Sequence, residues 1–222
     1  MSGATRTATG AGASVPRSRA DAARNRERIL TAAREAFVVH GPEAPLDEIA
    51  RSAGVGNATL YRHFPDRDAL VHGVVLSVTD RIAGRAKEAM DEEGSPFEAL
   101  RRYVRGAAEE RIGALCPMLS ERFDRADPAL DAAATRVEDL TRLLLERAQE
   151  AGEVRADIGV GDVTVALSQL TRPLPGVATQ GLAPFAERHV QLYLDGLRAP
   201  AKSELPGQAA TLEDLRQQHC GS

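Results

Sequence analysis

The sequence predicts an all-α fold of about nine helices, and three observations support this class. Apolar residues recur at steps of three and four positions in one segment after another, which is the spacing of one helix face. No segment shows the strict alternation of apolar and polar residues that marks a half-buried strand. Glycine and proline separate the periodic segments, as they do at helix ends.

The N-terminal part of the prediction consists of three helices followed by a longer one. Helices are expected over residues 21–40, 46–53, 57–63 and 66–91. Gly41 and Gly54 follow the first two, where a helix commonly ends. We expect residues 21–68 to form one small domain, and the helix over 66–91 to link it to a larger domain over 69–200.

The larger domain is predicted to contain the remaining helices. Gly94-Ser95-Pro96 marks its first boundary, and a break at Cys116-Pro117 precedes a further short helix. Longer helices are expected over residues 97–112, 129–151, 160–171 and 184–197.

Both chain ends are predicted to be disordered. Residues 1–20 are Gly, Ala, Ser, Thr and Arg with almost no large apolar side chain, and residues 201–222 are similarly polar, as in a flexible tail. The whole chain has a net charge of -4, yet residues 1–28 contain six Arg against two acidic residues. A basic arm beside an acidic body can attract phosphate at one end. A solvated tail explains the same charges.

Several protein classes find no support in the sequence. Cys116 and Cys220 are far apart and show no metal-binding spacing, so neither a metal site nor another cofactor is expected. There is no Glu-x-x-His pair, phosphate-binding Gly loop or activated nucleophile, so an enzyme is not expected. No apolar run reaches the roughly 18 residues of a membrane span, and no signal-peptide core is present. We therefore expect a cytoplasmic protein.

The stretch over residues 46–70 has the layout of a helix-turn-helix. A short amphipathic helix meets a tight turn at Gly54, which can take the positive φ that reverses the chain. Ala50 is small where the two helices must approach closely, and Val55 and Leu60 can fill the space between them. A second short helix then begins at Asn57.

The second of these helices has a polar face suited to DNA. Ala58 and Thr59 allow close approach to a thymine methyl, and Arg62 can reach guanine. Tyr61, His63 and Arg67 have polar tips suited to phosphate oxygens. The candidate DNA-binding residues are Asn57, Ala58, Thr59, Tyr61, Arg62, His63 and Arg67. A short surface helix with incidental polar residues is the alternative for any one of them.

Residues 59–70, Thr-Leu-Tyr-Arg-His-Phe-Pro-Asp-Arg-Asp-Ala-Leu, resemble the signature of TetR-type transcriptional regulators. Residues 25–37 are similar to that family's first helix, and the resemblance covers residues 22–72. One departure is Pro45-Leu46, where many members have a Ser or Thr that contacts a phosphate. The resemblance implies base or groove contacts from Asn57, Ala58, Thr59 and Arg62, and phosphate contacts from Tyr61, His63 and Arg67.

The resemblance also implies a function for the larger domain. It implies a homodimer through the helices over 160–171 and 184–197, bound to double-stranded operator DNA with a pseudo-palindromic sequence. It further implies a ligand-responsive regulator, a repressor in the family's usual mode, that a small-molecule inducer releases from its operator. An activator or an interaction module without a small-molecule ligand remains the alternative.

Candidate ligand-binding residues combine apolar bulk with a few polar groups, as small-molecule sites do. They are Tyr103, Met118, Leu119, Phe123 and Gln169. Ordinary core packing explains the same residues.

Overall fold

The computed structural model describes residues 15–92, 94–115, 127–173, 183–211 and 213, and these residues are helical with short connections and no β-strand. The helices are α1 (Val15–His40), the 3-10 helix η1 (Gly41–Glu43), α2 (Leu46–Ser52), α3 (Asn57–His63), α4 (Arg67–Asp91), α5 (Pro96–Glu109), α7 (Pro128–Glu150), α8 (Val160–Leu170) and α9 (Ala183–Leu197). The predicted all-α class is confirmed, with eight α-helices and one 3-10 helix in the part of the chain that the structure describes. Among the described helices, none is both long and apolar enough to cross a bilayer.

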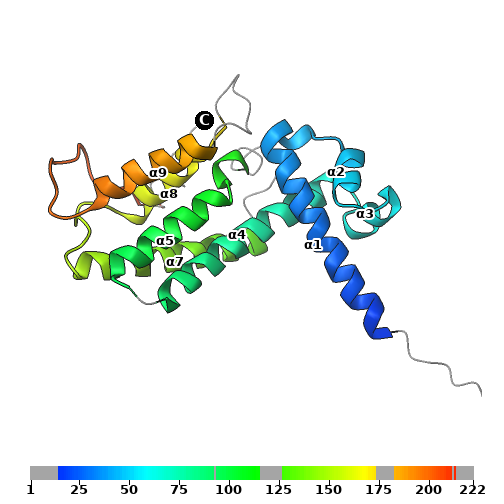
Figure 1. Ribbon diagram of the computed structural model, residues 1–222, viewed down its shortest axis with the longest axis horizontal. Helices are drawn as coiled ribbons and strands as arrows, with labels where there is room; N and C mark the ends of the chain where they lie inside the picture. The colour runs from blue at the N-terminus through cyan, green and yellow to red at the C-terminus, as the bar shows by residue number, and fades with distance from the viewer. Residues whose placement is uncertain (1–14, 93, 116–126, 174–182, 212, 214–222) are drawn as a thin grey trace, which may run out of the picture.

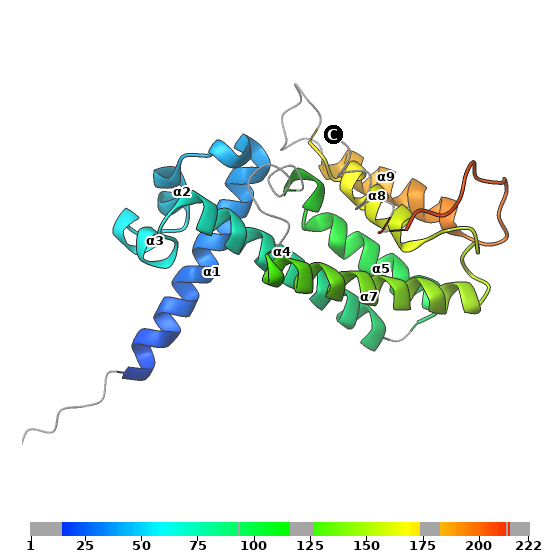
Figure 2. The ribbon, with the colours of Figure 1, turned by 180° about the vertical axis from the view of Figure 1, so that it is seen from behind.

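The helices are arranged as a small group at one end of the molecule and a larger body. Helices α1, α2 and α3 gather at one end, and α4 leaves them to run along the body (Figure 1). The reverse view shows α7 beside α4 and α5, with α8 and α9 beyond α5 (Figure 2). Helix α4 therefore contacts α1 at the small end and α5 and α7 in the body.

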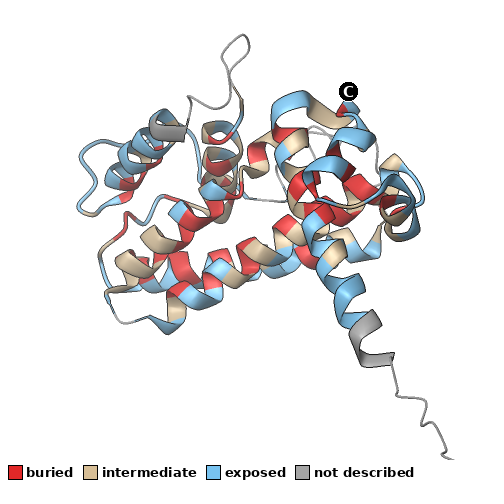
Figure 3. Ribbon diagram, turned by 45° about the vertical axis from the view of Figure 1, so that its right-hand side comes forward, coloured by how far each residue is buried: buried red, intermediate tan, exposed pale blue. Residues whose placement is uncertain are grey.

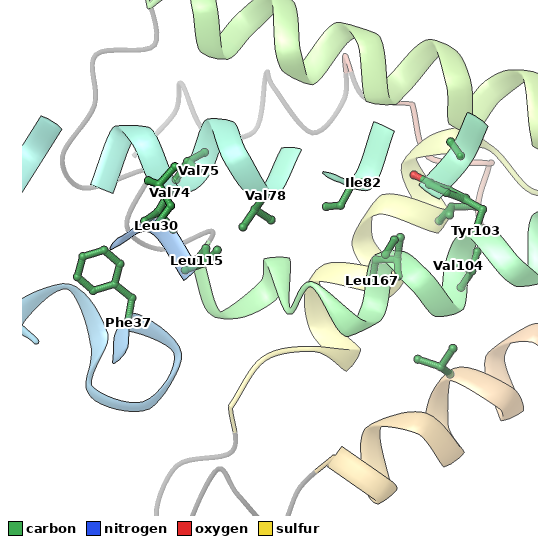
Figure 4. Packing of buried hydrophobic residues seen from close by; sticks show 14 of the residues in the cluster. Leu30, Phe37, Val74, Val75, Val78, Ile82, Tyr103, Val104, Leu115 and Leu167 are labelled. Atoms are coloured by element: carbon green, nitrogen blue, oxygen red, sulfur yellow. The ribbon is translucent and has the colours of Figure 1, made fainter. Parts of the chain in front are cut away.

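Helix α4 owes this position to an apolar face that is buried along its whole length. Leu70, Val74, Val78 and Ile82 recur at the predicted spacing and are at most 5% exposed. Asp66 caps the helix, because its side chain accepts a hydrogen bond from the Ala69 N–H at 2.7 Å. Buried residues continue from α1 through α4 into the body as one hydrophobic cluster (Figures 3 and 4).

The structure differs from the prediction at the N-terminal end. Helix α1 begins at Val15, inside the segment over residues 1–20 that was expected to be disordered. Arg and Ala are among the strongest helix formers, and the segment extends a helix that is already packed, so no new nucleus is needed. From Arg19 to Arg24 the helix is exposed, and its first turns project away from the body (Figure 1).

The C-terminal end also differs, because part of the expected flexible tail is bonded to the body. We call residues 198–211 the C-terminal strap. The Gly161 N–H donates to the Ala210 carbonyl at 2.9 Å, and the Ala210 N–H donates to Asp162 at 3.2 Å. Arg155 donates to the Ser203 carbonyl at 2.7 Å. All three bonds use backbone groups of the strap, so its amino-acid composition does not indicate them.

Candidate nucleic-acid interface

The helix-turn-helix forms as the sequence predicts, on a buried apolar support. Ile49 and Ala50 of α2 and Leu60 of α3 are each 1% exposed and belong to the hydrophobic cluster. Gly54 has a φ of +62°, the left-handed conformation that lets the chain reverse after α2. The Val55 N–H then donates to the Ala50 carbonyl at 3.0 Å, which closes the turn.

Arg28 ties this turn to α1 through a contact that the sequence does not predict. Its Nη2 donates to the Gly54 carbonyl at 2.8 Å. A Cβ at Gly54 would lie only 2.4 Å from the same nitrogen, so the arginine fits because position 54 is a glycine. The two residues are 26 positions apart, so no local pattern points to their contact.

The candidate DNA-binding residues of α3 are available on its outer side. Asn57, Ala58, Tyr61 and Arg62 are exposed, with Tyr61 at 50%, and the candidates Thr59 and His63 are partly exposed. Gly56 occupies the N-cap position, and no side chain caps the helix. Asn57 is therefore the first helical residue of α3 and does not cap it. The buried side chain of Leu60 anchors α3 in the hydrophobic cluster and so fixes the position of these exposed side chains. The structure thus gathers six of the seven candidates on one short, rigidly supported helix.

Arg67, the seventh candidate, is engaged elsewhere. Its Nη1 donates to the carbonyls of Pro42 at 2.6 Å and Ala44 at 2.7 Å. These bonds fasten the start of α4 to the connection between α1 and α2. A phosphate contact would have to use the remaining N–H groups of its guanidinium, which can donate five in all.

A second arginine of α1 lies close to the end of the helix-turn-helix. The Arg26 guanidinium lies 4.9 Å from the centre of the Phe64 ring, within the range of a cation–π contact. Phe64 itself is buried directly after α3. Arg26 and Arg28 therefore add positive charge beside α3 while they fix its position on α1.

The candidate ligand-binding residues do not come together within the described residues. Tyr103 is buried between α5 and α7, and its hydroxyl lies 2.6 Å from Thr141 Oγ1. Because the Thr141 hydroxyl donates to the Val137 carbonyl, the phenol is the donor to Thr141. Burial raises the pKa of Tyr103 above its usual range. Gln169 is exposed on α8. The other candidates, Met118, Leu119 and Phe123, lie outside the described residues.

Helices α8 and α9 leave large apolar side chains uncovered. Val165 is 38% exposed, Phe185 is 60% exposed and Leu192 is 57% exposed. The inward residues Val163 and Leu194 of the same helices are fully buried. Among the described residues, each of the two helices thus has a buried apolar side and exposed apolar side chains as well. Within the described residues, no group of three or more His, Cys, Asp or Glu side chains is placed to hold a metal ion.

Two family models match the chain, one in each part of the fold. Residues 29–74, which contain the helix-turn-helix, match bacterial regulatory proteins of the tetR family. Residues 95–199 match the C-terminal domain of SbtR-like transcriptional regulators.

Curated relatives and a solved structure agree with both models. The chain is 30% identical to the transcriptional regulator NfxB of Pseudomonas aeruginosa over 183 residues, 80% of this chain and 96% of NfxB. It is 33% identical to the transcriptional repressor LfrR of Mycolicibacterium smegmatis over 137 residues, 56% of this chain and 67% of LfrR. A TetR regulatory protein from Mycobacterium vanbaalenii superposes with a TM-score of 0.62 at 36% identity, over 82% of this chain and 99% of that one. The chain therefore belongs to the TetR family of transcriptional regulators.

Proposed function

We propose that this protein is a ligand-responsive repressor that binds a pseudo-palindromic operator as a homodimer and leaves it when a small molecule binds the body. The observation that carries the proposal is the outer side of α3. It presents Tyr61 and Arg62 to solvent while Leu60 is held in the core. A protein that acts on operator DNA in this way works in the cytoplasm.

The side chains on α3 suit both kinds of contact that a DNA reader needs. The Arg62 guanidinium can donate two hydrogen bonds to guanine in the major groove, and the small Ala58 lets the helix approach the bases. The Tyr61 hydroxyl can donate to a phosphate oxygen, which fixes the position of the helix without reading sequence. We propose Asn57, Thr59 and His63 as further contacts, and Arg67 through the N–H groups that it does not use within the chain.

The homodimer is proposed on the uncovered sides of α8 and α9. Phe185 and Leu192 are exposed apolar side chains on one helix, and such patches commonly mark protein–protein contacts. A two-fold dimer would present two copies of α3 to half-sites about one helical turn apart.

The small-molecule part of the proposal is supported by relatives. The structure of LfrR has been solved in complex with proflavine, and that chain superposes on this one with a TM-score of 0.62 at 24% identity, over 82% of this chain and 98% of that one. We propose that the ligand of this protein also binds in the body, where Tyr103, Met118, Leu119, Phe123 and Gln169 remain the candidates. Proflavine is the first probe to try.

The test begins with a selection of binding sites from genomic DNA by the purified protein. Fluorescence anisotropy on the selected site then compares wild type with Arg62→Ala and Tyr61→Ala. The control is Arg147→Ala, which removes the same charge as Arg62→Ala from an exposed position of α7. Loss of a bidentate base contact costs about 1–3 kcal/mol of binding free energy, so Arg62→Ala should bind at least about fivefold more weakly than the control. Equal affinities for all four proteins would show that α3 does not contact the operator.

The ligand is tested on the same complex. Release of wild-type protein by proflavine, at concentrations that do not displace a control repressor from its own operator, supports the repressor with an inducer. A stable complex under every small molecule tried favours an activator or interaction module without a ligand.

A further inference from the structure

Glu110 is a buried carboxylate at the junction of the two parts of the fold. It occupies the C-cap position of α5 and is 5% exposed. Its Oε2 accepts a hydrogen bond from Arg34 Nη1 at 2.6 Å and lies 3.2 Å from Arg81 Nε. Neither arginine is near Glu110 in the sequence, since Arg34 lies on α1 and Arg81 on α4.

A fourth charged residue completes the group. Arg81 Nη1 lies 3.7 Å from Glu27 Oε1, which is on α1 as well. We call Glu27, Arg34, Arg81 and Glu110 the Glu110 cluster. Two positive and two negative side chains balance each other, and they connect α1, α4 and the end of α5.

The backbone and the apolar residues around the cluster bring the end of α5 back to α1. Arg111 has a φ of +53°, a left-handed conformation that costs a non-glycine residue about 1–2 kcal/mol. The chain after it carries Leu115, which is fully buried beside Leu30 of α1 and Val74 of α4 (Figure 4). A groove of about 690 Å³ between α1 and α4 is lined by Glu27, Arg81 and Glu110, so one side of the cluster lies open to solvent.

The charges and the apolar contacts do different work at this junction. Apolar side chains such as Leu30 and Leu115 attract each other without a preferred direction, so they tolerate small rotations of α1. A buried ion pair does not tolerate such rotations, because moving one partner away leaves the other charge without compensation where little water reaches it. Arg34 is 22% exposed and Arg81 is 30% exposed. Glu110 contacts both guanidiniums, and Glu27 is a second, more distant partner of Arg81.

We propose that Glu110 is a positioning residue that holds α1, and with it α2 and α3, in one orientation relative to the body. A movement of the end of α5 is passed to α1 through Arg34 and to α4 through Arg81. The inference concerns orientation alone and rests on the proposed function only for what that orientation serves.

The test measures the orientation directly, without DNA. Spin labels are placed at Glu48→Cys on α2 and Glu146→Cys on α7, both exposed, in a chain whose Cys116 and Cys220 are replaced by serine. An excess of unlabelled protein keeps labels on separate chains apart. Pulsed electron paramagnetic resonance then reports the distance distribution between the small domain and the body. The control is Glu109→Gln, the neighbouring residue, which is exposed and lies 3.7 Å from Arg85.

We expect one narrow distribution in wild type and in Glu109→Gln. In Glu110→Gln the wild-type peak should be lost to a broad or shifted distribution, because Arg34 loses the carboxylate that it contacts and Arg81 keeps only the longer contact with Glu27. If Glu110→Gln does not fold, Arg34→Gln removes the ion pair by changing its more exposed partner. This variant should broaden the distance distribution too. A wild-type distribution in whichever of these variants folds overturns the proposal.

The two proposals can fail separately. On the selected operator, Glu110→Gln should change affinity by about tenfold relative to Glu109→Gln, within the usual range of coupling between sites. A broadened distribution in a protein that binds no operator would uphold the positioning role and sink the repressor. An unchanged distribution in a protein that binds its operator would do the reverse.

Discussion

At the scale of single residues, Gly54 and Arg28 decide the geometry of the helix-turn-helix. Gly54→Ala should lower the free energy of unfolding by about 1–2 kcal/mol, because alanine resists the left-handed conformation. Its Cβ would also displace the Arg28 guanidinium from the Gly54 carbonyl. The matched control is Gly196→Ala on α9, since that glycine has open space around its Cβ position and no positive φ. Urea titrations that show the same stability for both variants would contradict this account.

Asp127 at the start of α7 gives the protein an acid-sensitive contact. One of its oxygens accepts from the Ala129 and Leu130 N–H groups, and the other lies 2.8 Å from the His72 ring on α4. These contacts, the Leu130 N–H above all, hold the pKa of Asp127 below its ordinary value of 3.8. A depressed pKa in the folded state stabilises the protein above the ordinary value, and this stability is lost as the pH falls through the lowered one.

Asp127→Asn should therefore reduce stability at neutral pH and weaken the fall in stability below about pH 3.8. Asp131→Asn is the control, because it removes the same charge from an exposed position in the first turn of α7, away from the His72 contact. Free energies of unfolding measured from neutral to acid pH give the comparison. If the free energy of unfolding falls in the same way at acid pH in the two variants, the cap and the His72 contact contribute nothing to the pH dependence.

The candidate residues divide according to how far their partners lie along the chain. The outer face of α3 was predictable, because helical spacing places Leu60 inward and therefore Tyr61 and Arg62 outward. The contacts of Arg28, Arg67 and Glu110 were not, because their partners lie more than 20 positions away and are chosen by the tertiary packing.

At the scale of elements, the C-terminal strap and α8 meet at glycines. A Cβ at Gly161 would lie 2.4 Å from the Ala210 carbonyl oxygen, so Gly161→Ala should push the strap away from α8 and destabilise the protein. Gly84 in α4 has nothing near its Cβ position, and Gly84→Ala should stabilise by about 0.5–1 kcal/mol through helix propensity. Thermal unfolding should move the two variants in opposite directions. An unchanged or raised melting temperature for Gly161→Ala would contradict the close contact between the strap and α8.

Most helix boundaries were predictable because their signals are local. Asp66 and Ser95 cap helices within one turn of themselves, and proline occupies the first turn of α5 and α7. The start of α1 and the path of the strap were not predictable. An exposed segment rich in Arg and Ala at the start of α1 is compatible with both helix and coil. The strap is held by backbone hydrogen bonds to a distant helix, and these produce no residue pattern.

At the scale of the whole molecule, the uncovered sides of α8 and α9 predict an assembly. The double variant Phe185→Ser with Leu192→Ser should convert a dimer into monomers while the helical content stays unchanged, because both side chains are largely exposed within one chain. Leu143→Ser is the control, an exposed leucine on α7. Sedimentation velocity measures the mass of each species. If the double variant remains a dimer, the interface does not involve these side chains of α9.

The central claim is that the protein reads DNA through α3 as a dimer. The most direct measurement is the binding of purified wild-type protein to DNA from its own promoter region, followed by anisotropy across a salt series with competitor DNA. The account predicts tight binding that resists competitor, at two protomers per site, with affinity that falls linearly on a log–log plot as salt rises. Only weak binding that competitor abolishes, both there and on DNA recovered by genome-wide selection, would contradict it.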